Sequence, residues 1–279
     1  MKPSEKLIPF VQPIFIPDVN HYGINERSIV SFAEYITKYP YNVKCYFIGW
    51  AATQQHWDSI VKVIKDNIPA HMLYKIVKKE DNLGKGHVVN EALDDIKDED
   101  FEYFLTCDSD IIFLPSEPHM FERLLNVAKK MNSLHDKKIG FLANEQKGCS
   151  AHYYAALNDK YIVDGRDGAK EELIYCKVQP GHIAGGSIFV SKEAWFQIGG
   201  YRAVAVYGGD DGCLLKDFRK NSYNCYLAKS ISIFHPPNTD QEYNQWKSRT
   251  CKKDVGKNTF EELKNKANKF WNNRYNNKE

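Results

Sequence analysis

Short apolar runs alternate with helix-spaced segments through the first half of the chain, and this alternation restricts the possible folds most strongly. The strand-like runs cover residues 10–17, 43–50, 71–79 and 101–108, and the helical patterns cover residues 24–39, 53–68 and 85–98. Strands and helices that alternate at this pace form a mostly parallel sheet with helices on both faces. Ligands bind such sheets beyond the carboxyl ends of the strands. We therefore expect functional residues in segments 17–20, 49–53, 81–86 and 107–110.

The second half of the chain has a less regular pattern. Residues 140–175 are polar and rich in turn-forming residues, which predicts loops and edge strands beside the main sheet. Residues 185–201 have the pattern of a strand, a helix and a turn, and residues 225–237 form a last predicted strand that ends in His235 and two prolines. A single histidine at a strand end is usually structural, so His235 matters only if the fold returns it to the acids at residues 108–110.

The last part of the chain, residues 241–279, has a composition of its own. It carries ten Lys and Arg residues against five Asp and Glu residues, a net charge of +5, while the whole chain has a net charge of only +2. Aromatic residues are spread through it, among them Trp246, Phe260, Phe270, Trp271 and Tyr275. The simpler interpretation is a helical appendage that packs its aromatic side chains on the domain; the alternative is a surface that grips an anionic acceptor or partner.

Cysteine usage and the start of the chain predict a cytoplasmic protein. The seven cysteines are odd in number and scattered without a Cys-x-x-Cys pair, which argues for reduced thiols and against a disulfide framework or a zinc ribbon. Prolines interrupt the apolar stretch near the N-terminus, so a strand is expected there and not a signal peptide. No apolar run approaches the roughly 20 residues that a membrane-spanning helix needs.

An Asp-x-Asp motif comes directly after the fourth predicted strand. Asp108 and Asp110 stand one residue apart after a strongly apolar run, where an extended chain would point both carboxylates the same way. Mg²⁺ and Mn²⁺ prefer such oxygen ligands and leave room for phosphate oxygens. A simple strand-to-loop turn built from Asp and Ser is the alternative. The position at the carboxyl end of a parallel strand favours the metal-binding interpretation.

The glycine-rich segment at residues 81–93 opens a helix and invites a phosphate-binding interpretation. It does not match a P-loop, because no Gly-Lys-Ser or Gly-Lys-Thr closes it. It does not match a dinucleotide-binding loop either, because Val89 stands where the third glycine belongs. The segment therefore predicts a different kind of nucleotide site, or only a loop that needs free backbone angles.

Two adjacent acids, Asp210 and Asp211, come after two glycines and precede a helical pattern with Leu214, Leu215 and Phe218 on one face. Like charges side by side repel, so their proximity calls for an explanation. A helix start provides one, because Asp is a favoured N-cap and its charge suits the positive helix end. Catalysis provides another, because a carboxylate at a helix start stays ionised and can act as a general base. The two interpretations are compatible.

Taken in order, these motifs resemble those of the GT-A fold glycosyltransferases, and most of all the family-2-like inverting enzymes. The likeness covers residues 9–237 and rests on seven motifs: Pro-Asp-x-Asn at 17–20, Asn-x-Gly-Lys-Gly at 82–86, Asp-x-Asp, Gly-Gly-x-x-x-Val-Ser at 185–191, Gly-Gly-Tyr at 199–201, Gly-Gly-Asp-Asp at 208–211 and the late His235. The segment from 184 to 218 also resembles the carboxyl-terminal half of the β-1,4-galactosyltransferase-like group.

The resemblance implies a fold and a division of the chain. The expected fold class is α/β of the GT-A type, a Rossmann-like and mostly parallel central sheet flanked by helices, with a helical C-terminal appendage. Residues 1–240 would form the glycosyltransferase domain, with a nucleotide-binding half at 1–115 and a catalytic and acceptor half at 116–240. Residues 241–279 would be the basic aromatic tail.

The resemblance also implies roles for single residues. Asp110 would be the direct ligand of Mn²⁺ or Mg²⁺, His235 would complete the coordination of that ion, and Asp108 would lie near both the metal and the donor ribose. Asp211 would be the general base, and Asp210 would contact the acceptor from the position where the family usually has Glu. The remaining expected donor-binding residues are Pro17, Asp18, Asn20, Trp50, Asn82, Lys85, Gly185 and Gly186.

One departure from the family affects the nucleotide. Family-2 members usually end the second strand with an Asp that reads the uracil ring, whereas this chain has Trp50 followed by Ala51, Ala52 and Thr53. Trp50 is the candidate for stacking on a base instead.

The resemblance therefore predicts a metal-dependent inverting hexosyltransferase that uses a nucleotide sugar such as a uridine diphosphate hexose. The acceptor would be a glycan or a lipid-linked glycan, with a modified nucleic acid as the weaker choice. Two alternatives stay open. A sugar-nucleotide pyrophosphorylase usually carries a glycine-rich loop with Arg after the first strand, which this chain lacks. A non-catalytic carbohydrate-binding protein would have lost some of the site residues, yet Asp108, Asp110, Asp211 and His235 are all present.

Overall fold

The computed structural model describes residues 6–50, 52–80, 84–148, 159–165, 168–177, 185–202 and 210–236. Within these ranges the strands are β1 (Ile8–Phe15), β2 (Val43–Trp50), β3 (Leu73–Lys78), β4 (Tyr103–Cys107), β5 (Ile139–Lys147), β6 (Lys160–Asp164), β7 (Lys170–Tyr175), β8 (Ser187–Ser191) and β9 (Asn224–Phe234). The helices are α1 (Val19–Lys38), α2 (Gln54–Asn67), α3 (Lys85–Asp95), α4 (Met120–Leu134), α5 (Lys192–Ile198) and α6 (Asp210–Lys220), and a single 3₁₀ turn, η1 (Ala70–Met72), precedes β3.

The described strands form one mixed sheet in the order β3-β2-β1-β4-β8-β5-β9-β7-β6. Its first half is parallel, because β1 pairs in parallel with both β2 and β4, and β2 pairs in parallel with β3. This half confirms the predicted alternation of strands and helices, and β2 has the predicted bounds. Its second half mixes directions: β8 runs antiparallel to β4 and β5, while β9 runs parallel to β5 and antiparallel to β7.

The prediction for residues 140–175 was wrong for β5. This strand lies inside the sheet between β8 and β9, whereas β7 and β6 are the last two strands on one side of the sheet, with β6 at the edge. The polar residues Asn144 and Gln146 made the segment read as a loop, but both are buried within the fold. No helix was predicted for residues 120–134 either, where α4 lies.

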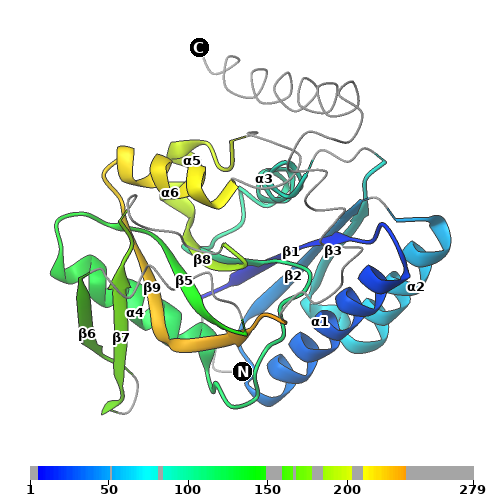
Figure 1. The fold of residues 1–279 in the computed structure, drawn as a ribbon, viewed down its shortest axis with the longest axis horizontal. Coiled ribbons are helices and arrows are strands. Elements are labelled where there is room, and N and C mark those ends of the chain that lie inside the picture. Colours follow the sequence, from blue (N-terminus) through cyan, green and yellow to red (C-terminus); the bar gives the residue numbers. More distant parts are fainter. Residues whose placement is uncertain are drawn as a thin grey trace.

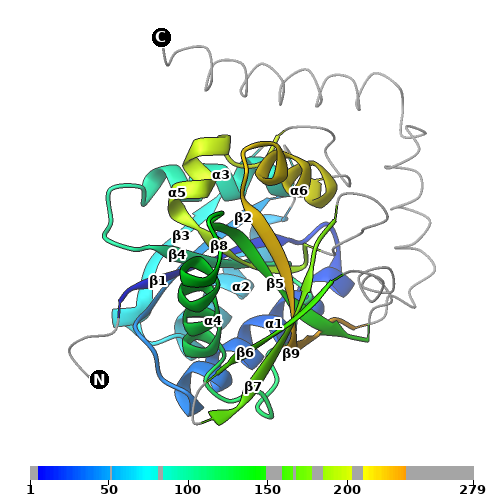
Figure 2. The same cartoon turned by 90° about the vertical axis from the view of Figure 1, so that its left-hand side faces the viewer.

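Helices cover both faces of the sheet, and each face has its own apolar core. Figures 1 and 2 show α1 and α2 on one side of β1–β3, and α3, α5 and α6 on the other side. One core cluster contains Phe32 of α1, Ile60 of α2 and Leu124 of α4, all fully buried. The other contains Val88 of α3 and Trp195 of α5, again fully buried. The sheet is therefore covered as a Rossmann-like fold requires.

The helix that starts with the two adjacent acids confirms the predicted pattern. Helix α6 begins at Asp210, and its apolar face buries Leu214, Leu215 and Phe218. Asp210 and Asp211 therefore occupy the first turn, where the positive end of the helix favours negative charge.

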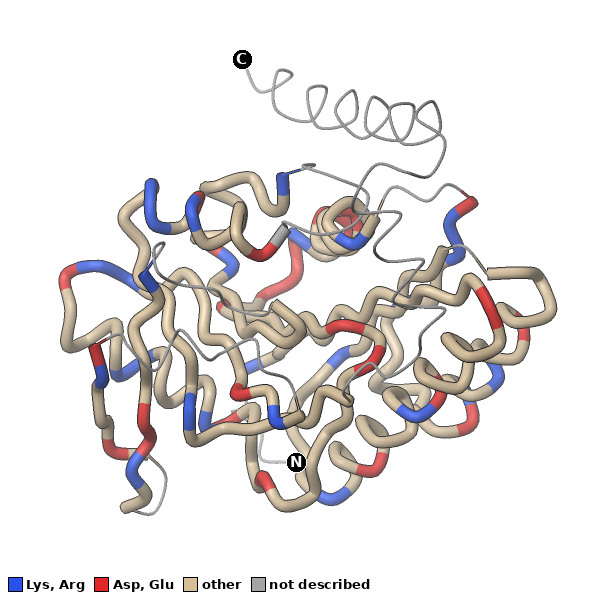
Figure 3. The backbone as a smooth tube through the Cα atoms, viewed as in Figure 1, with Lys and Arg blue, Asp and Glu red and all other residues tan. Residues whose placement is uncertain are grey.

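Neither the distribution of charge nor the cysteines indicates a particular binding partner. Lys and Arg are interspersed with Asp and Glu along the described elements (Figure 3). Cys45, Cys107, Cys176, Cys213 and Cys225 are free thiols, as expected. None of the described helices is long and apolar enough to cross a membrane. The cytoplasmic location and the division into halves at residue 115 stay predictions, and the tail at 241–279 lies outside the described residues.

Candidate functional site

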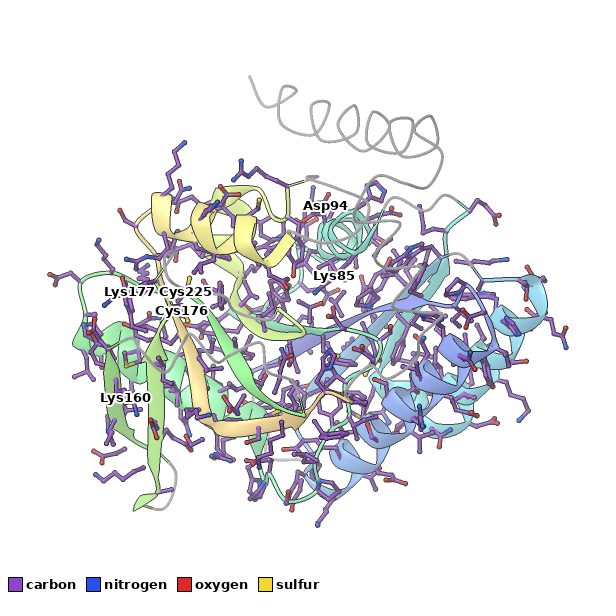
Figure 4. All side chains as sticks on the ribbon, viewed as in Figure 1. Lys85, Asp94, Lys160, Cys176, Lys177 and Cys225 are labelled. Carbon is purple, nitrogen blue, oxygen red and sulfur yellow. The ribbon has the colours of Figure 1, made fainter. Side chains whose placement is uncertain are left out.

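Four segments that are distant in sequence meet at one edge of the sheet, and Lys85 is at their centre. Lys85 is the first residue of α3 and lies between that helix and the sheet (Figure 4). Its ammonium nitrogen is 2.6 Å from Oδ1 of Asp108, directly after β4, and 3.7 Å from Oδ1 of Asp211 in α6. It also donates a hydrogen bond of 3.1 Å to the carbonyl of Gly185, just before β8. One cation thus links two of the predicted acids.

The contact between Asp211 and Gly185 depends on the absence of a side chain at residue 185. The Gly185 backbone N–H donates to Oδ2 of Asp211 at 2.8 Å. A Cβ atom at residue 185 would lie 1.9 Å from Oδ1 of Asp211, far inside van der Waals contact. Oδ1 itself is buried and has no hydrogen-bond partner among the described residues. Oδ2 of Asp211 is therefore held by a hydrogen bond, whereas Oδ1 accepts none from the described residues.

Lys85 is charged and well supported. Only 17% of its side chain is exposed. Burial alone would lower the pKa of the Lys85 ammonium, but Asp108, Tyr201 and Asp211 outweigh that effect and raise the pKa well above its ordinary value. The Tyr201 ring lies 5.7 Å from this ammonium, and Asn90 of α3 holds the Tyr201 backbone with two hydrogen bonds of 3.0 Å. The position of Lys85 is thus defined by contacts on several sides.

Sheet topology brings His235 back to Asp110, as the metal-binding interpretation requires. Ile112 and Phe234 form an isolated antiparallel bridge with backbone hydrogen bonds of 2.8 and 2.9 Å. This bridge carries His235, the residue after β9, to within 3.5 Å of Asp110, measured from Nε2 to Oδ2. The His235 N–H also donates to the carbonyl of Lys147 at the end of β5. Two residues that lie 125 positions apart in the sequence therefore face each other.

The geometry around His235 favours a cation between the two side chains. Nδ1 of His235 lies 3.1 Å from the carbonyl of Pro236, which can only accept a hydrogen bond, so Nδ1 carries the proton. In the neutral ring Nε2 then presents a lone pair to the Asp110 carboxylate, and two electron-pair donors face each other. A proton or a metal ion resolves that opposition. Hydrogen bonding of the second ring nitrogen is also the usual arrangement of a metal-binding histidine.

Asp110 has unused capacity as a ligand. Its Oδ1 is buried and has no hydrogen-bond partner among the described residues. Burial raises the pKa of the Asp110 carboxyl group above its ordinary range, although nearby His235 opposes the shift. A carboxylate in this state gains from a cation. Asp110 and His235 therefore fit Mn²⁺ or Mg²⁺, ions that take only one or two protein carboxylates and complete their coordination with phosphates and water.

Asp108 takes a different place from the other two predicted ligands. Its carboxylate contacts Lys85, and its N–H donates to the carbonyl of Gly186 at 2.6 Å. Over the described ranges, no group of three His, Cys, Asp or Glu side chains is arranged to hold a metal ion. The pair of Asp110 and His235 is thus separate from the contact of Asp108 with Lys85.

The predicted donor-binding residues at the ends of β1 and β2 have local structural roles. Asp18 is the N-cap of α1 and accepts a hydrogen bond of 2.9 Å from the His21 N–H. Burial tends to raise the pKa of Asp18, but the hydrogen bonds from His21 lower it overall. Pro17 is half-buried before this cap, and Asn20 is exposed in the first turn of the helix.

Trp50 is 6% exposed, and its ring centroid lies 5.5 Å from that of Phe15. Its indole N–H has no partner among the described residues. Stacking of Trp50 on a base stays a prediction, as does the role of Gly186, whose Cβ would lie 2.8 Å from the Gln146 side chain. Asn82 and the side chain of Asp210 lie outside the described residues.

Two features of the site were not predicted. Lys85 was expected among the donor-binding residues, but its link between Asp108 and Asp211 was not. The role of Asn90, which holds the segment after α5 through Tyr201, was not expected either. The sequence signal for this contact was the pair Gly199–Gly200. Both residues are at positive φ, and a Cβ atom at residue 200 would lie 2.1 Å from Asn90 Oδ1.

Comparison with known proteins identifies the fold. No protein-family model matches the chain, and no curated protein matches it by sequence. Among solved structures, S. aureus TarS 1-349 superimposes with a TM-score of 0.53 at 13% identity, over 83% of this chain and 60% of that chain. A longer structure of S. aureus TarS gives a TM-score of 0.54 at 12% identity, over 86% of this chain and 38% of that chain.

TarS is a family-2 glycosyltransferase, and the present chain spans less than two thirds of either TarS chain. At this identity the likeness establishes the architecture alone. The protein has a GT-A-like glycosyltransferase fold.

Proposed function

We propose that this protein is a metal-dependent inverting glycosyltransferase that moves a hexose from a nucleotide sugar to an acceptor hydroxyl. The observation that carries the proposal is the meeting of Asp108, Lys85 and Asp211 at one edge of a GT-A-like sheet, with Asp110 and His235 beside them. Ligands of open α/β sheets bind at this edge. The arrangement supplies a base, a fixed cation and a pair of metal ligands.

Asp211 is the general base of this mechanism. Its Oδ2 is held by the Gly185 N–H, while its Oδ1, 3.7 Å from the Lys85 ammonium, has no hydrogen-bond partner among the described residues and would accept the proton of the acceptor hydroxyl. As that proton moves to Oδ1, the hydroxyl oxygen forms a bond to the anomeric carbon of the donor sugar. The bond from that carbon to the diphosphate oxygen breaks at the same time, and the nucleoside diphosphate leaves. Attack opposite the leaving group inverts the configuration.

Asp110 and His235 would hold the divalent cation, through Oδ1 or Oδ2 of the carboxylate and through Nε2 of the ring. The chemistry that a bound Mn²⁺ or Mg²⁺ supplies is neutralisation of the charge on the departing diphosphate. Asp108, Asp110 and Asp211 place three carboxylates in the site, against one ammonium and a histidine. A donor with a diphosphate would meet net repulsion there without a cation. This charge balance supports dependence on a metal.

Lys85 keeps Asp108, near the donor, and Asp211, the base, at a fixed separation. Its ammonium contacts Asp108 and lies near Asp211, so neither carboxylate needs to move when a donor enters. Preorganised charge of this kind contributes to catalysis because it costs no rearrangement during the reaction. Lys85 is in this account a positioning residue that also binds the donor.

A glycan or lipid-linked glycan is the acceptor that we favour, and the basic aromatic tail at 241–279 is its proposed contact. Lys and Arg attract charged polymers, and aromatic faces pack on sugar rings. Deleting residues 241–279 should spare hydrolysis of the donor but weaken the use of the acceptor, and added salt should weaken it in the full chain too. Unchanged transfer by a folded truncated protein at every salt concentration would remove the tail from this role.

The test of the proposed function is a screen of nucleotide sugars without an acceptor. The full chain should release free sugar and nucleoside diphosphate from one donor when Mn²⁺ or Mg²⁺ is present, and Asp110→Ala should lose this activity. A pyrophosphorylase would instead consume pyrophosphate and form sugar 1-phosphate. A carbohydrate-binding protein would give no product with any donor. Either of those results would contradict the proposal.

A further inference from the structure

Strand β9 makes a corner halfway along its length, and His235 lies beyond that corner. In Figure 1 the strand, drawn in orange, bends sharply between its two ends. Ala228 pairs with Asn144 of β5, but the next pair is Ser232 with Glu145. Lys229, Ser230 and Ile231 therefore stand between two consecutive partners and have no counterpart in β5. Such extra residues bend a strand and change the direction of the residues after them.

The extra residues decide where the strand ends. If the pairing of Ala228 with Asn144 continued without a bulge, Ile231 would lie opposite Lys147. Phe234 lies there instead. At about 3.3 Å per residue, a strand without the bulge would carry His235 about 10 Å past its present position. The corner therefore sets the register that brings His235 to Asp110.

Arg123 of α4 holds the corner from outside the site. One of its terminal nitrogens donates to the carbonyl of Ser230 at 2.6 Å. The same guanidinium forms a two-pronged ion pair with Glu171 of β7, with distances of 2.7 and 2.8 Å. The Ser230 hydroxyl donates to Glu171 at 2.5 Å and accepts from the Glu172 N–H at 3.0 Å. The Glu171 side chain is 1% exposed, so these contacts are shielded from water.

The same corner is connected to the other half of the site. The Asn144 amide donates to the carbonyl of Ile231 at 3.3 Å, and its oxygen accepts from the Ser187 hydroxyl at 2.9 Å. Ser187 directly follows Gly186, whose carbonyl accepts the Asp108 N–H. The corner is thus braced against the floor of the site as well as against α4.

We propose that Arg123 and Glu171 form a latch on the β9 corner, and that they are positioning residues for the cation site of Asp110 and His235. The link to a metal ion rests on the proposed function, whereas the effect of the latch on the register of β9 does not. The latch holds Ser230, the held corner fixes the register of residues 232–234, and this register places His235. Arg123 and Glu171 touch neither the acids nor the histidine of the site, so they act through β9 and, for Arg123, also through Glu117, which pairs with Lys147 of β5.

A double variant separates positioning from stability. Replacing a buried ion pair with apolar side chains of similar size is often neutral for stability, whereas removing one partner leaves an uncompensated charge. Arg123→Met with Glu171→Met should therefore keep a thermal midpoint close to that of the wild type, since Glu117, the other partner of Arg123 at 3.1 Å, keeps its ion pair with Lys147 at 3.4 Å. Asn132→Ala is the matched control, because Asn132 lies on the same helix but holds the start of β5 through the Ile139 N–H at 2.7 Å.

The experiment has two readouts. Hydrogen exchange in the metal-free proteins should show faster exchange at residues 232–235 in the double variant, where the Phe234 and His235 amides are bonded to Ile112 and Lys147. Residues 224–228 should keep their protection. Titration with Mn²⁺ in the presence of uridine diphosphate should show a dissociation constant raised about 10–100-fold, the usual effect of losing an outer support of a metal site. The control should change neither.

The outcomes distinguish the two proposals. Unchanged exchange at 232–235 in the folded double variant overturns the latch, and so does an equal loss of protection along all of β9. Unchanged Mn²⁺ affinity despite faster exchange overturns the link between the latch and the cation site. If the wild type binds no Mn²⁺ but the exchange result is as expected, the proposed metal role of His235 fails while the latch stands.

Discussion

Asp108 and Asp110, separated by one residue, follow directly after β4, yet their surroundings differ. Asp108 belongs to what we call the lysine side, formed by Asp108, Lys85, Gly185 and Asp211, which is closed by contacts within the chain. Asp110 belongs to the histidine side, formed by Asp110 and His235, where Oδ1 of Asp110 has no partner among the described residues and Oδ2 lies 3.5 Å from Nε2 of His235. The carboxylates of the lysine side share an ammonium, whereas the histidine side has no Lys or Arg in contact among the described residues.

The difference shows how one short motif can serve two purposes. On the lysine side, the ammonium of Lys85 offsets the cost of burying carboxylates, so the geometry of the base is set before any substrate binds. On the histidine side, burial raises the pKa of Asp110, and the nearby His235 and the more distant Lys85 offset that shift only in part. A site of this kind gains free energy when a cation arrives. The lysine side is therefore suited to positioning and the histidine side to binding.

The largest expected effect is at the base. Asp211→Asn keeps the size of the side chain but removes its ability to take a proton. Turnover should fall by roughly 10²–10⁴, the usual contribution of general-base catalysis. Metal affinity should stay unchanged because the proposed ligands are on the histidine side, and donor affinity should stay unchanged because Lys85, Asp108 and Gly185 are kept. Steady-state kinetics with donor, acceptor and Mn²⁺, together with a binding titration of the donor, would measure this.

Asp210→Asn is the matched control for that variant, because it makes the same chemical change one residue earlier in α6. It should mainly raise the KM for the acceptor. If Asp210→Asn reduces turnover more than Asp211→Asn does, the two roles are reversed and the lysine side loses its base.

A single methyl group should disturb the lysine side almost as strongly. Gly185→Ala would place a Cβ 1.9 Å from the present position of Asp211 Oδ1, so the carboxylate must move. A displacement of about 1 Å at a reacting group can cost about 10²-fold in rate. Mn²⁺ binding should be unaffected, since Asp110 and His235 have no contact with residue 185 among those described. A normal rate in this variant would show that the position of Asp211 is not critical.

The smallest expected effect is a pH dependence of the stability that the ion pair of Arg123 and Glu171 contributes; this ion pair supports the histidine side. Burial alone would raise the pKa of Glu171, but Arg123 and Ser230 more than offset this and hold it below the usual value. A carboxyl group with a lowered folded-state pKa stabilises the fold fully above its unfolded pKa, about 4.3, and loses that contribution as pH falls through the folded value.

The thermal midpoint of the wild type should therefore fall more steeply below about pH 4.3 than that of the Arg123→Met and Glu171→Met double variant. Midpoints measured in steps from neutral pH to strongly acidic pH would test this. Parallel curves would show that the ion pair contributes nothing through its charge.

The predictable parts of the molecule are those with a local signal. The bounds of β2 and the start of α3 can be read from apolar patterning, and Asp108 and Asp110 from their place after a buried strand. Helix α4 also had a signal, since Met120, Phe121, Leu124, Leu125, Val127, Ala128 and Met131 are its buried face. Strand β5 had a misleading signal, because its buried Asn144 and Gln146 are polar.

The unpredicted parts depend on contacts between distant segments. Nothing near Gly185 in sequence indicates that Asp211 will approach it to within hydrogen-bonding distance. Nothing near Arg123 indicates that it will hold the carbonyl of Ser230, because backbone atoms carry no sequence signal. The resemblance to a family supplied the order of the motifs, but the split into a lysine side and a histidine side needed three-dimensional geometry.

The most direct test of that split is a thermal-shift measurement with Mn²⁺ and uridine diphosphate on three proteins. At a hundredfold excess over the dissociation constant, binding should stabilise the wild type by about 2.7 kcal/mol. Asp211→Asn, on the lysine side, should keep the full shift of the midpoint. Asp110→Ala, on the histidine side, should lose it. A full shift in Asp110→Ala, or its loss in Asp211→Asn, would contradict the assignment of the cation to the histidine side.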